Sequence, residues 1–333
     1  MTSASTTDPD PGTATPAPSN TAAEQFAKRR QSPLQRVQHT LHAHPAISPF
    51  LVLVISWIVF TSLNPNFGSL RTTSLILQQV AVVGALAIGQ TLIILTAGID
   101  LSVGAIAILI GVLVGTAAGL VNGLLVTRLN LPPFIVTLGT LSIFTAMALL
   151  YSSGQSVQAA QMPDIMVWTG NVIAIGDFRL TTGVLLVLVM YMVVAFALKQ
   201  TTWGRHVYAV GNDAEAARLV GISVNRVLLS VYTVAGLIYG ITAWVLIGRT
   251  GAATPNAAAD ANLESITAVV IGGTSLFGGR GAVFGTLLGA LIVGFFRTGL
   301  SLAGVDDQYR VLAIGLLVIA AVSIDQWIRK VRA

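Results

Sequence analysis

The sequence predicts an all-α protein: a polytopic membrane helical bundle of about 8–10 spans, with broken or re-entrant helices among them. Two observations carry this prediction. Hydrophobic residues make up 54% of the 333 positions and charged residues only 9%, whereas soluble domains carry about 25% charged residues. The apolar residues also gather into runs of about 17 to 25 residues, which is the length that a helix needs to cross a bilayer.

The chain divides into four parts. Residues 1–27 are rich in Pro, Ser, Thr and Ala and lack the large apolar groups that offset ordering entropy, so we expect a disordered cytoplasmic tail. A basic juxtamembrane segment at 28–46 precedes the transmembrane domain at 47–328, which contains a polar cytoplasmic loop at 199–226. A cytoplasmic tail at 329–333 ends the chain. Lys and Arg cluster in these flanking segments, which places both termini in the cytoplasm.

The predicted spans do not alternate consistently across the membrane. Two termini on the same side require an even number of crossings, but nine apolar pieces are present. The conflict falls on the run at 105–126, because both flanking segments are expected inside. Either the segment around Asp100 is re-entrant, or a helix is missing here. The pieces lie at 47–63, 75–97, 105–126, 134–150, 180–198, 227–247, 282–303 and 308–328, with a shorter one at 265–278.

Asp100 is the residue of the apolar region that most needs an explanation. A carboxylate at membrane depth costs about 2.5 to 3.5 kcal/mol on insertion scales and normally faces the bundle interior or a wet cavity. Here it sits in the sequence GIDLSVG at 98–104, whose glycines and Ser102 hydroxyl favour a broken helix. Because broken helices at membrane depth line pathways, we predict that Asp100 and Ser102 lie on one.

The polar loop predicts a short helix beside the membrane. Asn212 and Asp213 are good helix N-caps, residues 214–219 favour a helix, and Gly221 suits its end. A simple amphipathic connector explains these residues as well as a docking helix does. The apolar positions that a partner could contact are Ala216, Leu219 and Val220.

Four segments of the chain resemble the permease subunits of bacterial ABC importers for monosaccharides, the ribose, xylose, galactose and fructose group. The resemblance covers about residues 48–325 and is closest to fructose and ribose permeases at 130–140 and 201–221. The segments read GIDLSVG, LPPFIVTLGT, TTWGRHVYAVGNDAEAARLVGISV and AVVIGGTSLFGGRGAVFGTLLGALIVG.

The resemblance implies a multi-pass permease of the bacterial inner membrane that pairs with a second copy. It would receive its sugar from a periplasmic or lipid-anchored binding protein and be driven by a separate cytoplasmic ATPase, which would hold ATP and Mg. We therefore expect no catalytic residue, metal or cofactor in this chain. The segment that docks on the ATPase maps onto Gly211, Asn212, Asp213, Ala214, Glu215, Ala216, Ala217, Arg218 and Leu219.

The glycine-rich stretch at 272–281 is not a nucleotide site. The sequence contains no G-x-x-x-x-G-K-[ST] phosphate loop, and this stretch lacks the lysine that would reach the phosphates. A tight turn that allows helices to approach closely explains it better. Basic residues are scattered at segment ends, where they act as orientation signals, so we expect membrane lipid and no nucleic acid as a partner.

One departure from the resemblance falls at the same place as the crossing conflict. Family members carry roughly 20 to 25 more residues between the GIDLSVG segment and the part that corresponds to 111–126, about one helix's worth. Here Ala105 and Ile106 run almost directly into that part. Both arguments predict a shortened or lost span near Ala105.

A neutral sugar requires hydroxyl and amide groups along its path, since these both donate and accept hydrogen bonds. For a single Ser or Thr, a bond to a carbonyl of its own helix is the plainer explanation. Gln90 and Asn122 are harder to satisfy in that way and favour contacts between helices. The candidates for the translocation pathway, besides Asp100 and Ser102, are Gln78, Gln79, Gln90, Thr91, Asn122, Thr137, Thr140, Thr267 and Thr274.

Two other classes of protein stay open. An ATPase-independent secondary transporter or channel for a small neutral solute would show internal inverted repeats and ion-coupling acids. A membrane enzyme would need a cluster of acids, bases or metal ligands, and the spans contain no such pattern. Neither class predicts the short cytoplasmic helix that begins at Asn212. Glu264, at the start of the short apolar piece, we expect to cap that helix.

Overall fold

The computed structural model describes residues 46–330, with gaps at 109–110, 256 and 259. The predicted tail at 1–27, almost all of the basic segment and residues 331–333 lie outside this part. Helices dominate it, which confirms the all-α membrane bundle. Five of the described helices are long and apolar enough to cross a membrane: α4 (Leu70–Leu95), α7 (Pro133–Ser152), α9 (Thr182–Gln200), α12 (Val224–Thr250) and α14 (Val283–Leu302).

The other elements are shorter or lie at the ends of the bundle. The helices are α3 (Ile47–Leu63), α5 (Val103–Ile108), α6 (Val112–Arg128), α8 (Asp164–Val167), α10 (Thr202–Asn212), α11 (Ala214–Leu219), α13 (Ala261–Ile271) and α15 (Asp307–Lys330). Single turns are η1 (Pro65–Gly68), η2 (Ala159–Gln161) and η3 (Trp168–Gly170). The strands β1 (Val157–Gln158) and β4 (Ala252–Ala253) pair antiparallel, as do β2 (Val172–Ile175) and β3 (Phe178–Thr181).

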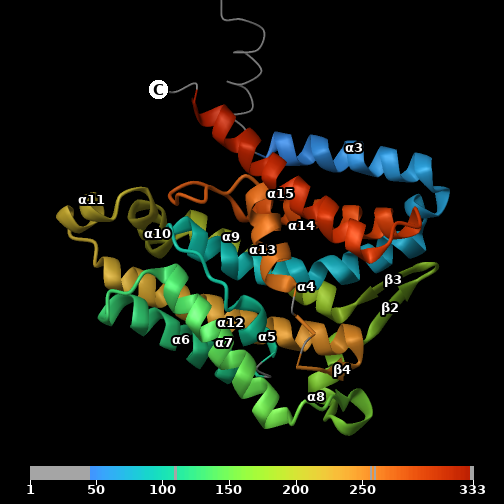
Figure 1. Cartoon of the computed structure of the whole chain (residues 1–333), viewed down its shortest axis with the longest axis horizontal. Coiled ribbons are helices and arrows are strands. Elements are labelled where there is room, and N and C mark those ends of the chain that lie inside the picture. The colour runs from blue at the N-terminus through green and yellow to red at the C-terminus, as the bar shows by residue number, and fades with distance from the viewer. Residues whose placement is uncertain (1–45, 109–110, 256, 259, 331–333) are drawn as a thin grey trace, which may run out of the picture. The chain divides into compact units, whose positions relative to one another are not determined.

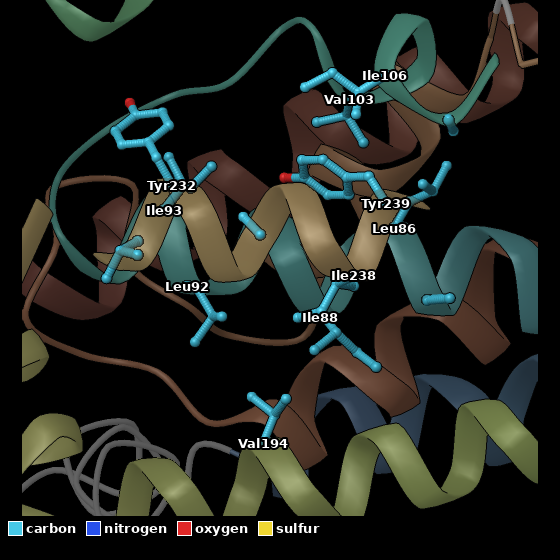
Figure 2. Packing of buried hydrophobic residues seen from close by; sticks show 14 of the residues in the cluster. Leu86, Ile88, Leu92, Ile93, Val103, Ile106, Val194, Tyr232, Ile238 and Tyr239 are labelled. Carbon is cyan, nitrogen blue, oxygen red and sulfur yellow. The ribbon is translucent and has the colours of Figure 1, made fainter. Parts of the chain in front are cut away.

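The core forms where α4 packs against α12. Leu86 and Ile93 of α4 lie beside Tyr232 and Tyr239 of α12 (Figure 2). Gly89 allows this approach, because a Cβ at that position would lie 2.9 Å from Cζ of the Tyr239 ring. Small residues at helix contacts are the usual means of bringing membrane helices together.

α6 packs on the other side of α12 along a stripe of glycines. A Cβ on Gly115 would lie 2.8 Å from the Gly240 Cα, and one on Gly123 would lie 3.0 Å from the Leu229 side chain. As the numbers rise along α6 they fall along α12, so the two helices are antiparallel. Gly119, midway between the two contacts, packs against the backbone of Gly236.

α4 also runs antiparallel to α12, because Gly89 faces Tyr239 and Gly98 faces Tyr232. α4 and α6 therefore point the same way, although only residues 96–111 separate them. The returning path contains one six-residue helix, α5. Helices that cross the membrane one after the other normally point in opposite directions, but α4 and α6 point the same way. The crossing conflict predicted from the sequence therefore lies between α4 and α6.

The single span predicted at 105–126 is therefore wrong. The described structure has two helices there, α5 and α6, and Gly111 between them adopts a φ of 127° that an L side chain rarely reaches. At six residues α5 is about 9 Å long, which is far short of a bilayer. The described part of the connection, residues 96–108 and Gly111, is a partial return into the bundle.

The bundle carries different structures at its two ends. Figure 1 shows α10 and α11 at one end and α8, β2 and β3 at the other. The second end is tied to α4, because the Gln78 side-chain amide donates a 2.9 Å hydrogen bond to the Arg179 carbonyl and the Arg179 amide donates to Ser74 Oγ at 2.9 Å. α4 itself begins at Leu70, since Ser69 Oγ accepts a hydrogen bond from the Thr72 amide.

Candidate functional site

Two capped helices form the α11 end of the bundle. Thr201 Oγ1 accepts a hydrogen bond from the Gly204 amide at 3.2 Å and begins α10. Asp213 Oδ1 accepts one from the Ala216 amide at 3.0 Å and begins α11. Gly221 follows α11 with a φ of 86°. The predicted short helix at 214–219 and its cap at Asp213 are confirmed, and Asn212 is instead the last residue of α10.

α11 presents an apolar edge beside an ion pair. Leu219 is 87% exposed and Val220 77% exposed, whereas Ala217 is buried against the bundle. On the same helix, Arg218 Nη1 lies 2.9 Å from Glu215 Oε1, and both side chains are exposed to solvent. Exposed apolar groups next to paired charges suit docking on another protein.

α10 fastens α11 to the rest of the bundle. Val207 and Val210 are buried, and the Tyr208 hydroxyl donates a 2.9 Å hydrogen bond to the Gly281 carbonyl. Burial raises the pKa of the Tyr208 phenol above its ordinary value of 10.0, so this donor stays protonated at neutral pH. The sequence did not predict α10.

The break after α4 is built around Asp100. Its Oδ1 accepts hydrogen bonds from the Ser102 amide at 2.7 Å and from the Ser102 hydroxyl at 2.6 Å. The Asn122 side-chain amide on α6 donates to the same hydroxyl at 2.8 Å. All three residues are buried. The structure thus brings together three predicted pathway residues, and it links Ser102 in the connection to Asn122 on α6, twenty residues further along the chain.

Further polar groups surround this break. The Thr137 hydroxyl on α7 donates to the Ile99 carbonyl at 3.1 Å. The Tyr232 hydroxyl lies 3.2 Å from where a Cβ on Gly98 would stand, and it is buried. Within the part of the chain that the structure describes, the phenols of Tyr232 and Tyr239 have no hydrogen-bond partner. The sequence could have indicated these two tyrosines as candidate pathway residues, because a buried tyrosine hydroxyl usually has a hydrogen-bond partner.

The remaining pathway candidates do not join this cluster through any described hydrogen bond. The Thr91 hydroxyl meets Thr286 on α14 at 2.8 Å, and Gln78 is bonded to the β3 backbone. Thr140 and Thr267 donate to carbonyls of their own helices, which is the plainer role. Gln79 is half-buried. Gln90 and Thr274 are buried, and their side-chain polar atoms have no partner among the described residues.

The expected role of Glu264 is wrong. Asp260 stands at the N-cap of α13, and the Glu264 carboxylate forms an ion pair with Arg297 Nη1 on α14. Glu264 is buried and Arg297 is partly exposed. A buried carboxylate is stabilised more by a full opposite charge than by the partial charge of a helix end, which explains the difference.

A bundle of membrane helices with a break at a buried acid, and with an exposed helix at one end, has the parts of a membrane permease. The chain matches the family model of the branched-chain amino acid transport system / permease component over residues 104–322. It belongs to this family. As a permease it is a transport component and not an enzyme.

Its relatives include several sugar permeases. The chain is 48% identical to the fructose import permease protein of Rhizobium meliloti, with 95% of each chain covered. It is 35% identical to the ribose import permease protein of Bacillus subtilis, with 88% of this chain and 97% of the relative covered. Identity with the D-allose transport system permease protein of Escherichia coli is 35% over 84% of this chain and 91% of the relative. No solved structure matches the chain.

The lengths of these alignments show that this chain is shorter inside the matched region. The alignment with the fructose permease has 342 positions, but 95% of 333 residues is only about 316, so about 26 positions have no counterpart here. The ribose permease alignment has 316 positions and covers about 293 residues of this chain, which leaves about 23. Either difference is close to the length of one membrane span.

Proposed function

We propose that this chain is the membrane-spanning permease subunit of an ATP-binding-cassette importer that moves a monosaccharide, fructose or ribose, into the cytoplasm. It works in the bacterial inner membrane as one of two copies. A cytoplasmic ATPase holds ATP and Mg, and a periplasmic or lipid-anchored binding protein delivers the sugar. In this arrangement α10 and α11 lie on the cytoplasmic side with both termini, and α8, β2 and β3 face outward.

The exposed edge of α11 is the observation that carries the ATP-driven part of this proposal. Leu219 and Val220 expose most of their surface although α10 anchors the helix beside them. A channel or secondary transporter has no need of a fixed apolar edge in the cytoplasm. An ATPase that closes on ATP does need one, because its movement must reach the membrane helices through a rigid contact. Residues 211–219 form this coupling segment.

The sugar passes close to the break after α4. Around Asp100, the side chains of Ser102, Asn122 and Thr137 are hydrogen-bonded to one another or to the connection. Hydroxyl and amide groups that can exchange such partners suit a neutral sugar, which offers only hydroxyls. Gln90 is a further candidate for contact with the sugar, because it is buried and its side-chain amide has no hydrogen-bond partner among the described residues.

We assign the missing stretch of about 23 to 26 residues to the connection at 105–111. The alignment lengths support a stretch of this size, and the shared direction of α4 and α6 supports this position, because a full helix between them would restore the alternation of spans. In this chain the six-residue helix α5 takes the place of that helix, but it is too short to cross the membrane.

The test is ATP hydrolysis by vesicles that contain this chain, its ATPase and its binding protein. Hydrolysis stimulated by the sugar-loaded binding protein is expected for the intact chain, and Glu215→Arg is expected to abolish the stimulation by reversing a charge on α11. Glu215→Gln is the matched control: it removes the same exposed ion pair without repulsion and should keep the rate within about twofold.

Each result has a distinct meaning. Stimulation that disappears in Glu215→Arg and survives in Glu215→Gln supports coupling through α11. If the intact chain is silent but a chain with about 25 residues restored between Ile108 and Gly111 is stimulated, the class stands and the shortened form is a defective transporter. Silence of both, with ATPase and binding protein that are active elsewhere, overturns the proposal.

A further inference from the structure

Three segments from distant parts of the sequence meet backbone to backbone at the α11 end of the bundle. They are the end of α10, the glycine-rich turn after α13, and the end of α4. The Gly279 amide donates a 2.9 Å hydrogen bond to the Leu95 carbonyl. A Cβ on Gly211 would overlap the same carbonyl oxygen and would lie 2.7 Å from the Gly279 nitrogen. We call the meeting of Gly211, Gly278 and Gly279 with α4 the glycine contact.

The contact leaves no room for side chains between these backbones. A Cβ on Gly278 would lie 2.5 Å from the Gly211 oxygen and 2.8 Å from the Ala97 Cβ, and one on Gly279 would lie 2.7 Å from the Asn212 Cα. Gly278 and Gly279 also have φ values of 82° and 68°. Glycine is required at both positions for two separate reasons, conformation and space.

On the α4 side, the glycine contact ends at the start of the break. Ala97 has a φ of 59°, a left-handed value that is rare for a residue with a Cβ. From there the chain passes Gly98 and Ile99 and reaches Asp100 within three residues. A displacement at Leu95 or Ala97 therefore reaches the Asp100–Ser102–Asn122 hydrogen bonds through a few backbone bonds.

On the other side, the glycine contact is continuous with the coupling segment. Gly211 belongs to α10, Asp213 caps α11 directly after it, and the Tyr208 hydroxyl holds the turn through the Gly281 carbonyl at 2.9 Å. Because tightly packed backbones cannot be rearranged by rotating side chains, they pass a shift on with little loss.

We infer that the glycine contact carries the movement of the coupling segment to the break at Asp100, so that Gly211, Gly278 and Gly279 are positioning residues for transport. This inference rests on the proposed function, since it needs an ATPase that moves α11. The competing route is the covalent one, in which α11 pulls on α12 through the short link at residues 220–223. The two routes differ in what a substitution at Gly211 does, because that substitution leaves the link to α12 intact.

The experiment uses vesicles with the full chain, its ATPase and its binding protein, and compares Gly211→Ala with Gly139→Ala. Gly139 also lies in a helix, but a Cβ there meets nothing within 4 Å, so it is the matched control. Gly211→Ala is expected to lower sugar uptake per ATP hydrolysed about tenfold, a typical size for coupling between sites. Gly139→Ala should stay within about twofold of the original.

A second variant and a second readout guard against a misfolded Gly211→Ala. Tyr208→Phe adds no volume and removes only the hydrogen bond to Gly281, and it should lower uptake per ATP about threefold. The chain has no cysteine, so Ala97→Cys supplies a single thiol at an exposed position of the break. Its rate of labelling by a membrane-impermeant maleimide should change with ATP in the original background and not in Gly211→Ala.

The outcomes separate the inference from the proposed function. If the original chain shows no stimulated hydrolysis, the proposed function falls and takes this inference with it. If the original chain is stimulated but Gly211→Ala and Tyr208→Phe retain full uptake per ATP and the ATP-dependent labelling, the inference alone is overturned. The movement then travels through α12.

Discussion

The side-chain amide of Asn122 on α6 donates a 2.8 Å hydrogen bond to the hydroxyl of Ser102 in the connection after α4. That hydroxyl donates in turn to Asp100 Oδ1 at 2.6 Å. The broken helix is therefore held in place from α6 through a single buried relay. Because α6 also packs tightly on α12, the position of the break depends on how these two helices meet.

Replacing Asn122 with alanine should destabilise the fold. The Ser102 hydroxyl would lose a partner in a buried site, and such a loss costs about 1 to 3 kcal/mol in the free energy of unfolding. Denaturant unfolding of the purified chain in detergent measures it. Thr116→Ala, also on α6, removes a hydroxyl that bonds only to the Val112 carbonyl of its own helix and should change little. Equal losses in both variants would show that the relay contributes nothing.

The carboxyl of Asp100 should act as a hydrogen-bond acceptor more than as a charge. Asp100→Asn keeps an oxygen for the two bonds from Ser102 and removes a buried charge that has no ion-pair partner among the described residues. Its stability should match or exceed that of the original chain. Asp100→Ala loses both bonds and should cost about 2 kcal/mol in the same unfolding measurement. An asparagine variant as unstable as the alanine variant would contradict this.

The sequence was informative wherever a structure depends on neighbouring residues. Asp213 and Gly221 marked α11 correctly, and the glycines around Asp100 marked the break. Contacts between distant segments could not be predicted. Nothing near Asn122 indicates that it reaches Ser102, since this follows from the antiparallel packing of α6 on α12.

α10 and Glu264 were missed for related reasons. Two glycines inside α10 lower its helix propensity by about 1 kcal/mol each. They are present because of tertiary contacts, since a Cβ on Gly204 would overlap the Leu198 backbone and one on Gly211 would overlap Leu95. Glu264 suits a helix start by composition, but its partner Arg297 lies thirty-three residues further along the chain. In both places the local sequence preference was read correctly, but contacts with other parts of the chain determined the structure.

A side chain at Gly119 should force α6 away from α12. A Cβ there would overlap the Tyr232 carbonyl and lie 2.8 Å from the Gly236 Cα. Gly119→Val is expected to lose about 1 to 3 kcal/mol, the usual cost of overpacking. Gly139→Val on α7 makes the same chemical change where nothing lies within 4 Å, so it controls for the helix propensity of valine. Similar melting temperatures for the two variants would argue against the α6–α12 contact.

Removing one partner of the Glu264–Arg297 ion pair should lower the free energy of unfolding more than removing both partners. Arg297→Gln leaves a buried carboxylate without its cation, and the expected loss is about 2 kcal/mol, less than for a fully buried pair because the Arg297 side chain is 35% exposed. Adding Glu264→Gln to that variant should recover most of the loss, since no charge is then left alone. Thermal unfolding of the two single variants and the double variant measures this, and additive losses would contradict the pairing.

Uptake of labelled fructose and ribose into sealed vesicles that hold this chain and its ATPase distinguishes an ATP-driven permease from a passive channel. Sugar-binding protein is supplied on the outer side, and ATP or ADP is enclosed within. Accumulation of one sugar above its outside concentration with ATP, with none with ADP or without binding protein, is the result predicted for an ATP-driven permease. Equal uptake with ATP and ADP that stops when the concentrations match would instead identify a passive channel and overturn ATP-driven import.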